Sequence, residues 1–446
     1  MNVILIVVDS LRSDNLSISG YSRKTSPNID KLASSGVYFN NAISVFPSTT
    51  PALASIMTGL YPHSHEIRFL YTHKLSPKVT VLQEILKAHG YTTIGNDIEA
   101  RNTGLERGFN EFNLISWRIK TKIKRNIKKI LKPGYKTMPQ ESLTDFAIKT
   151  IDRVKNRKFF LYLHYMGLHW PYAPPAPYDH MFDSDYTGKH TFNEVDGEIK
   201  RGDLIFNNNL PAREIEHAIA HYDGAINNVD FHIGRLLNHL KSLELEKNTI
   251  IVLTADHGEC FGEHNLFFNH GDYLYDEALR VPLIIKCPAL PQKKIQSQVQ
   301  LTDIMPTVLE LLKIPAVDKV DGVSLVPLIN EDKKVREYAF SETGRPYFNQ
   351  NKRAYIPGIK GKWRMIRTNK WKLIYIPHPE KDIFELYNIE KDPMEKNNLI
   401  EQEPEKADFL KKRLFEWIPK SDLEQSENDD LTQRSIKLLR QAGYIE

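Results

Sequence analysis

The chain has 446 residues, a length that fits one large α/β domain together with a smaller one. Hydrophobic residues make up 41% of the chain and charged residues 26%, as in an ordinary soluble globular protein. The formal net charge of +4 is small for this length and gives no reason to expect a nucleic-acid partner, and the two cysteines point to neither a disulfide framework nor a cysteine-based zinc site.

Short apolar runs alternate with helical patterns up to about residue 335. Strands are predicted at residues 3–8, 92–95, 159–164, 250–254 and 282–286. Helices are predicted from Ser26-Pro27 to Gly36, from about 80 to 89 and from about 211 to 243. This alternation predicts an α/β fold with a mostly parallel central sheet and helices on both faces. In such sheets the ligand site lies beyond the carboxyl ends of the strands.

The pattern changes after about residue 335. Antiparallel strands are predicted at 363–366, 372–376 and 384–387, and amphipathic helices at about 403–417 and 430–442. We therefore expect a large domain over residues 1–335 and a small C-terminal α+β subdomain over residues 336–446.

The N-terminus lacks the features of a secretory signal. Met1-Asn2 leads directly into an apolar run that ends in Asp9, without a basic start or a cleavage site of small residues. No stretch is long enough to span a membrane. These observations predict a cytoplasmic protein.

Residues 117–136 are rich in lysine and arginine, and isoleucines form an apolar stripe among them. A basic amphipathic helix can lie on an anionic membrane surface or hold an acidic polymer. Peripheral membrane contact through this segment is therefore one interpretation. The other is a surface helix that packs its isoleucines on the core.

Metal-binding side chains follow two of the predicted strands at the point where each leaves the sheet. Asp9 follows residues 3–8, and Asp256 and His257 follow residues 250–254. Carboxylate and imidazole ligands together suit zinc or manganese better than calcium, which prefers oxygen alone. The alternative is that the two aspartates only cap the helices that follow.

A hydroxyl group stands at the start of another predicted helix. Ser48-Thr49-Thr50 precedes Pro51, at a position where the first helical turn tolerates proline, and small residues follow. A hydroxyl at a helix N-terminus lies near unpaired backbone N–H groups, and a nearby metal would lower its pKa and make it a nucleophile. The alternative is an ordinary N-cap.

Several blocks together resemble the sulfatase-like family of the alkaline phosphatase superfamily. Residues 49–59 are similar to the sulfatase signature, in which Cys or Ser precedes x-Pro-x-Arg and a Leu-Thr-Gly ending. Further blocks in the family's order are Asp9-Ser10-Leu11-Arg12, Thr25-Ser26-Pro27-Asn28, His169-Trp170-Pro171-Tyr172, Asp256-His257-Gly258-Glu259, His270-Gly271 and Leu386-Tyr387-Asn388. The similarity covers most of the chain and implies an esterase acting on phosphoric or sulfuric esters, with residues 1–335 as the catalytic domain.

The departures from the signature bear on the chemistry. Sulfatases convert a Cys or Ser to formylglycine, which the threonine at position 49 cannot become, and Leu53 replaces the signature arginine. The set Asp9, Thr49, Asp256 and His257 looks more like the metal site of phosphoglycerol and phosphoethanolamine transferases in the same superfamily. That resemblance implies one divalent ion, Mn²⁺ or Zn²⁺ ahead of Ca²⁺ or Mg²⁺, held by these four residues.

The same resemblance assigns the remaining site residues. His169 and His270 would contact the transferred group, and Thr49 would be the nucleophile. Ser10, which replaces a second N-terminal acid, and the histidines His164 and His264 are further candidates near the site.

The leading hypothesis is cleavage of phosphate esters or diesters through a covalent Thr49 ester, which water or an acceptor alcohol then releases. A sulfatase that works without formylglycine is the first alternative. The second is an inactive relative that binds an anionic glycan or lipid. The expected substrate is a small-molecule, glycan or lipid ester, and no nucleic acid is expected.

Overall fold

The computed structural model describes residues 1–68, 74–97, 103–113, 140–170, 172–188, 211–271, 273–344, 362–377, 381–420 and 422. The basic segment 117–136 and the helix predicted at 430–442 lie outside the described residues. The predicted membrane contact through 117–136 therefore stays a prediction.

The centre of the molecule is a sheet whose strand order is β10-β2-β9-β6-β1-β5-β3-β4, with β11 also paired to β2. Strand β1 (Asn2–Val8) lies between β5 (Phe159–Tyr165) and β6 (Thr249–Thr254), parallel to both. β3 (Thr92–Asn96) and β4 (Glu111–Asn113) continue the parallel part. Every residue of β1, β5 and β6 is buried, as the continuous apolar runs predict.

The other side of the sheet is partly antiparallel, so the sheet is mixed. β9 (Arg280–Lys286) pairs antiparallel with both β6 and β2 (Val37–Ile43). The short strands β10 (Lys293–Ile295) and β11 (Val299–Gln300) run parallel to β2. β2 was not predicted because Asn40-Asn41 interrupts its apolar pattern, and the register shifts at this point, between Phe39 and Ala42.

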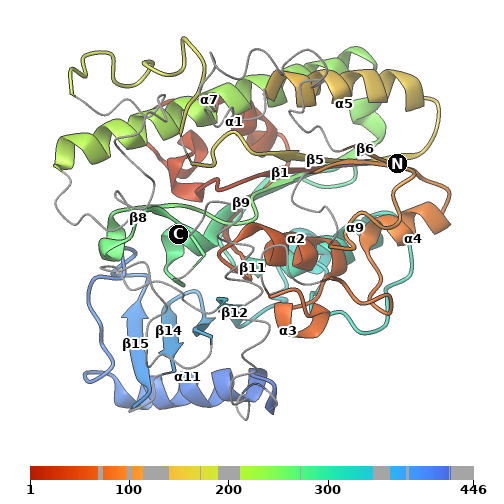
Figure 1. Cartoon of the computed structure of the whole chain (residues 1–446). Coiled ribbons are helices and arrows are strands. Elements are labelled where there is room, and N and C mark those ends of the chain that lie inside the picture. Colours follow the sequence, from red (N-terminus) through yellow and green to blue (C-terminus); the bar gives the residue numbers. More distant parts are fainter. Residues whose placement is uncertain are drawn as a thin grey trace, which may run out of the picture.

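Helices cover both faces of the sheet (Figure 1), which confirms the predicted architecture. One face carries α1 (Pro27–Ser34), α5 (Gln140–Val154) and α7 (Ala212–Ser242). The other carries α2 (Thr49–Thr58), α3 (Pro62–His65), α4 (Leu82–Ala88) and α9 (Ile304–Leu311). Shorter elements are β7 (Cys260–Phe261), β8 (Phe267–Asn269), α8 (Asp276–Leu279) and α10 (Val326–Glu331).

A second, antiparallel sheet follows in the order β12-β13-β14-β15. Its strands are β12 (Ala339–Glu342), β13 (Arg364–Arg367), β14 (Trp371–Ile376) and β15 (Ile383–Asn388). Helix α11 (Pro404–Trp417) packs on this sheet through Ala407, Leu410 and Leu414. The predicted antiparallel C-terminal part is confirmed, with β12 as an additional strand, while the boundary between residues 335 and 336 stays a prediction.

The C-terminal sheet shares a hydrophobic core with the first part of the chain. Met365 and Ile374 lie in one buried cluster with Ile43 of β2 and with Leu274 and Leu279 around α8. The second sheet therefore packs directly against the end of β2 and against α8.

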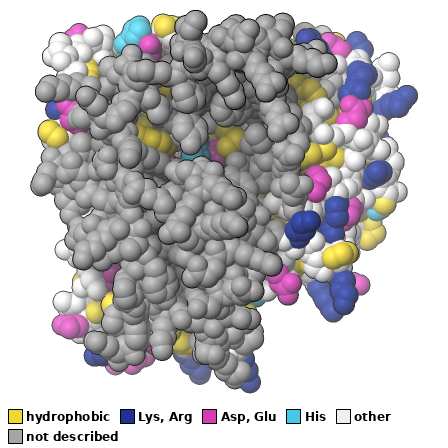
Figure 2. All heavy atoms as spheres, viewed as in Figure 1, with side chains coloured by type: hydrophobic (Ala, Val, Ile, Leu, Met, Phe, Trp, Pro, Cys, Tyr) yellow, Lys and Arg dark blue, Asp and Glu magenta, His cyan; other side chains and the backbone are white. Residues whose placement is uncertain are grey.

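On the face in Figure 2, the described side chains that are visible include basic and acidic ones interspersed with one another, in keeping with the small net charge. Among the described residues, no helix combines the length and the apolar character that crossing a membrane requires.

Candidate active site

Two aspartates meet at the carboxyl edge of the parallel strands. Val7 of β1 pairs with Thr254 of β6, so the residues that leave these two strands emerge side by side. Asp9 and Asp256 are both fully buried. Ser10 connects them, because its backbone N–H donates to Asp256 Oδ1 at 3.2 Å and its hydroxyl donates to Asp9 Oδ1 at 2.6 Å.

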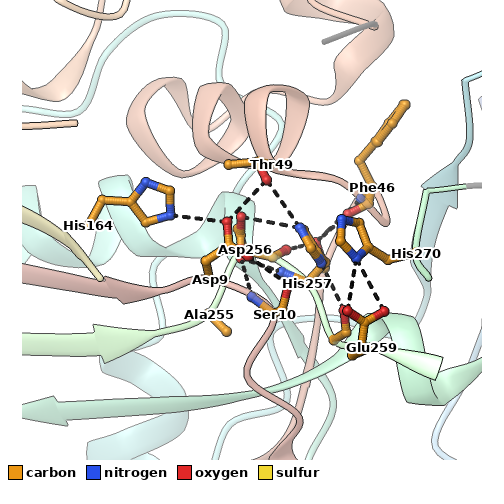
Figure 3. A network of polar contacts seen from close by, with 12 residues as sticks. Asp9, Ser10, Phe46, Thr49, His164, Ala255, Asp256, His257, Glu259 and His270 are labelled. Atoms are coloured by element: carbon orange, nitrogen blue, oxygen red, sulfur yellow. Dashed lines mark hydrogen bonds and ion pairs between the residues drawn. The ribbon is translucent and has the colours of Figure 1, made fainter. Parts of the chain in front are cut away.

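Thr49 is the first residue of α2, whose N-terminus lies over this pair of carboxylates (Figure 3). Its hydroxyl donates to Asp9 Oδ2 at 3.3 Å and lies 3.2 Å from His257 Nε2. Ser48 takes the N-cap position, so Thr49 is not the N-cap. The hydroxyl thus sits where the backbone N–H groups and the positive end of the helix dipole favour a developing oxyanion.

Gly258 fixes the path of the chain behind Asp256 and His257. A Cβ atom at this position would lie 2.0 Å from the carbonyl oxygen of Glu277. The Gly258 N–H also donates to the Ala278 carbonyl at 2.8 Å. Only glycine therefore allows this close approach, and the approach holds His257 against Thr49.

Gly258→Ala is expected to lower the free energy of unfolding by about 1–3 kcal/mol, the usual cost of forcing a side chain into a packed site. The displaced loop would also weaken metal binding through His257. Urea denaturation monitored by fluorescence measures the first effect, and titration of the metal-stripped protein measures the second. An unchanged midpoint would show that the Glu277 segment yields at little cost.

Four histidines around the carboxylates share one anchoring pattern, in which Nδ1 contacts an oxygen outside the cluster. The contacts are His257 with the Gly258 carbonyl (2.8 Å), His164 with Asp97 Oδ1 (3.0 Å), His169 with the Trp170 carbonyl (2.8 Å) and His270 with Glu259 Oε1 (3.3 Å). Carbonyl and carboxylate oxygens only accept hydrogen bonds, so Nδ1 is the donor in each ring. In the neutral ring Nε2 then holds the lone pair that a metal or a reacting group needs.

The rings themselves lie close together. The centroids of His257 and His270 are 4.1 Å apart, and those of His169 and His270 are 5.5 Å apart. His164 lies on the other side of the aspartates from His257 (Figure 3), with Nε2 at 3.7 Å from Asp9 Oδ2.

The donor set fits a divalent cation. Asp9, His164 and Asp256 offer ligand atoms within 4.8 Å of one another, the one such group in the part of the chain that the structure describes. Asp256 Oδ2 and His164 Nε2 are buried and have no hydrogen-bond partner among the described residues. Buried polar atoms normally have partners, and a cation between the two atoms would supply one.

Electrostatics at the site point the same way. Burial raises the pKa of Asp256, whereas for Asp9 the surrounding imidazoles outweigh burial and hold its pKa well below the ordinary value. Burial opposes protonation of His164, but Asp97 and the two site aspartates raise its pKa to about 10. So much buried carboxylate charge favours a bound cation.

Of the predicted site residues, His264 lies apart from this network. Its ring stacks on Tyr275 with the centroids 3.5 Å apart, and its Nε2 lies 3.8 Å from Glu277 Oε1. Burial lowers the pKa of His264 to about 4. The other predicted residues contact one another or lie in the same ring cluster.

Two residues of the network were absent from the sequence-based set. Glu259 contacts His270, and Asp97 contacts His164. Asp97 directly follows β3, so a carboxylate at the end of a parallel strand was the available signal. Glu259 adjoins the Asp256-His257-Gly258 block, but only the fold brings it to His270.

A buried hydroxyl that faces carboxylates and imidazoles at the carboxyl edge of such a sheet is an arrangement suited to ester cleavage. The sulfatase family model matches residues 1–314, and the model of the N-sulphoglucosamine sulphohydrolase C-terminal region matches residues 262–420. The chain belongs to the sulfatase family. This confirms the predicted family and the predicted class of enzyme, a hydrolase of sulfuric or phosphoric esters. Enzymes of this family bind a divalent metal ion.

Individual relatives cover nearly the whole chain. An arylsulfatase of Clostridium perfringens is 30% identical, with 94% of each protein covered, and arylsulfatase K of Homo sapiens is 25% identical, with 94% of this chain and 82% of that protein covered. A phosphonate monoester hydrolase of Agrobacterium radiobacter superposes with a TM-score of 0.72 at 21% identity, covering 93% of this chain and 95% of that one. A structure in complex with its substrate D-glucosamine-2-N,6-O-disulfate superposes equally well, with a TM-score of 0.72 at 21% identity and 98% of each chain covered.

Proposed function

We propose that this protein cleaves phosphoric esters, diesters included, through a covalent ester on Thr49. The observation that carries the proposal is the position of the Thr49 hydroxyl, 3.3 Å from Asp9 Oδ2 and 3.2 Å from His257 Nε2 at the start of α2. A side chain that only capped the helix would have no need of these two partners.

The threonine at position 49 favours a phosphoric ester over a sulfuric ester as the substrate. A threonine lacks the formylglycine aldehyde through which sulfatases release sulfate from a hemiacetal. Attack at phosphorus needs only an activated hydroxyl: a bond forms between Thr49 Oγ1 and phosphorus, and the bond to the leaving alcohol breaks. Attack by water or an acceptor alcohol then restores the threonine.

His169 and His270 supply the polar groups for the transferred phosphoryl group. Each ring is oriented through Nδ1, and the proposal assigns the Nε2 edge of each ring to a phosphoryl oxygen or to the leaving alcohol. Glu259 accepts a hydrogen bond from His270 Nδ1 and orients the ring, and in the proposed step His270 donates a proton to the leaving oxygen.

Asp9, Thr49, Asp256 and His257 would hold one divalent ion. When bound, this ion would lower the pKa of the Thr49 hydroxyl and offset the charge of the two aspartates. The mixed nitrogen and oxygen donors favour Zn²⁺ or Mn²⁺ over Ca²⁺ or Mg²⁺.

The substrate class is a small-molecule or glycan ester. Among relatives of the chain, one from Bacteroides thetaiotaomicron is named N-acetylglucosamine-6-O-sulfatase, at 26% identity. Because relatives of the chain are named sulfatases, a sulfuric ester is the second candidate substrate.

The test compares aryl esters with the same leaving group: a phosphate monoester, a phosphate diester, a phosphonate and a sulfate. The protein is stripped of metal and then given Mn²⁺, Zn²⁺ or Ca²⁺. We expect metal-restored turnover of a phosphorus ester at a rate well above that of the sulfate. Turnover of the sulfate alone would overturn the proposal, and absence of both turnover and bound metal would favour an inactive relative that binds an anionic glycan or lipid.

A further inference from the structure

We propose that His164 is a further ligand of the metal ion and that Asp97 holds it in the ligating orientation. The inference rests on the metal of the proposed function and adds a residue that the resemblance to transferases does not include. It concerns what holds the ion, and it is independent of whether the substrate contains phosphorus or sulfur.

The position of His164 follows from the pairing of the strands. His164 lies on β5 and pairs with Val7 of β1, two residues before Asp9. It therefore stands at the same carboxyl edge as the two aspartates, and its side chain is buried.

One ring nitrogen of His164 is engaged in a hydrogen bond with Asp97. Nδ1 donates to Asp97 Oδ1 at 3.0 Å, and the other oxygen of Asp97 accepts a hydrogen bond of 2.6 Å from the Tyr162 hydroxyl. Asp97 is itself buried. A carboxylate behind an imidazole fixes the tautomer and turns the opposite nitrogen outward, as in carboxylate–histidine–metal triads.

The other nitrogen, Nε2, points at the carboxylates and lacks a hydrogen-bond partner among the described residues. Asp256 Oδ2 also lacks a hydrogen-bond partner among the described residues. A histidine that only filled core space would leave Nε2 unsatisfied at a cost of about 1–3 kcal/mol. A cation accounts for both atoms at once, since the ligand atoms of Asp9, His164 and Asp256 lie within 4.8 Å of one another.

The arrangement places two imidazoles on opposite sides of the aspartate pair (Figure 3). His257 Nε2 is 3.4 Å from Asp256 Oδ2, and His164 Nε2 is 3.7 Å from Asp9 Oδ2. With Thr49, an ion between them would have three oxygen and two nitrogen donors. With His164 as a second nitrogen donor, the site should prefer Zn²⁺ or Mn²⁺ over Ca²⁺ more strongly than a site with His257 as its single nitrogen donor.

The test is calorimetric titration of the metal-stripped full-length protein with Zn²⁺, Mn²⁺ and Ca²⁺. His164→Ala is expected to weaken Zn²⁺ binding by roughly 100-fold, and Asp97→Asn by roughly 10-fold or more, as loss of an orienting partner does in other sites. Ca²⁺ affinity should change much less. His264→Ala is the matched control, since His264 lies outside the network, and its affinities should equal those of the wild type.

Pulsed electron paramagnetic resonance of the Mn²⁺-loaded protein gives a second readout. Nitrogen couplings from two imidazoles are expected in the wild type and from one in His164→Ala. Should His164→Ala fail to fold, as judged by circular dichroism without metal, Asp97→Asn carries the test. Wild-type Zn²⁺ affinity and unchanged nitrogen couplings in the folded variant would overturn the inference, whereas failure of the proposed phosphoester activity would leave these results unaffected.

Discussion

Thr49→Ala is expected to lower kcat for the preferred phosphorus ester by roughly 10³-fold or more, because it removes the group to which the phosphoryl group is transferred. The change also removes the buried contacts of the hydroxyl with Asp9 and His257, so the free energy of unfolding should fall by about 1–3 kcal/mol while the protein still folds. Steady-state rates with the metal-loaded protein measure the loss. Mass spectrometry of the acid-quenched wild type should find a phosphate ester on the peptide that contains Thr49.

Thr49→Ser is the matched control because it keeps a hydroxyl at the start of α2. It should retain far more activity than Thr49→Ala and should form the same covalent ester. If Thr49→Ala keeps more than about a tenth of the wild-type rate, Thr49 is not the nucleophile and water must attack the ester directly.

Lys372→Ala is expected to lower the free energy of unfolding by about 3–5 kcal/mol, the usual cost of breaking a buried ion pair from one side. Lys372 of β14 is fully buried, and its ammonium group lies 2.9 Å from Asp276 Oδ1 and 2.8 Å from Glu395 Oε1. Removing it leaves Glu395 without this partner, although Arg367 still contacts Asp276 at 2.8 Å. Urea denaturation measures the difference.

Lys370→Ala is the control for this change, because Lys370 belongs to the same hairpin but is exposed, with Glu390 at 3.6 Å. Surface changes of this kind usually fall within about 0.5 kcal/mol of the wild type. Equal midpoints for the two variants would mean that the buried charges rearrange or take up water when Lys372 is lost.

Sequence reasoning located the parts of the fold that depend on local patterns. The apolar runs of β1, β5 and β6 and the periodic apolar residues of α7 were predicted within a few residues of their observed bounds. β2 and β12 were not predicted. Their pairing depends on neighbours remote in the chain, and Asn40-Asn41 interrupts the apolar pattern of β2.

In the site, too, local patterns predicted some residues, whereas contacts between residues remote in the chain were not predicted. Asp9 and Asp256 were expected at one edge of the sheet because each follows a parallel strand, and the resemblance to the transferase metal site placed Thr49 with them. The structure brings the three residues together. The partners that orient the histidines could not be predicted in this way. The contact between His164 and Asp97 joins residues 67 positions apart, and no periodicity carries that information.

The shared core of the two sheets has a consequence for exchanging parts between relatives. Ile43, Leu274 and Leu279 are covered by Met365 and Ile374 of the second sheet. Grafting the C-terminal sheet of another family member onto this chain would thus require complementary side chains on both sides of the junction. Unmatched halves would leave apolar surface open beside the loop that carries His270, so the two sheets are best inherited as one unit.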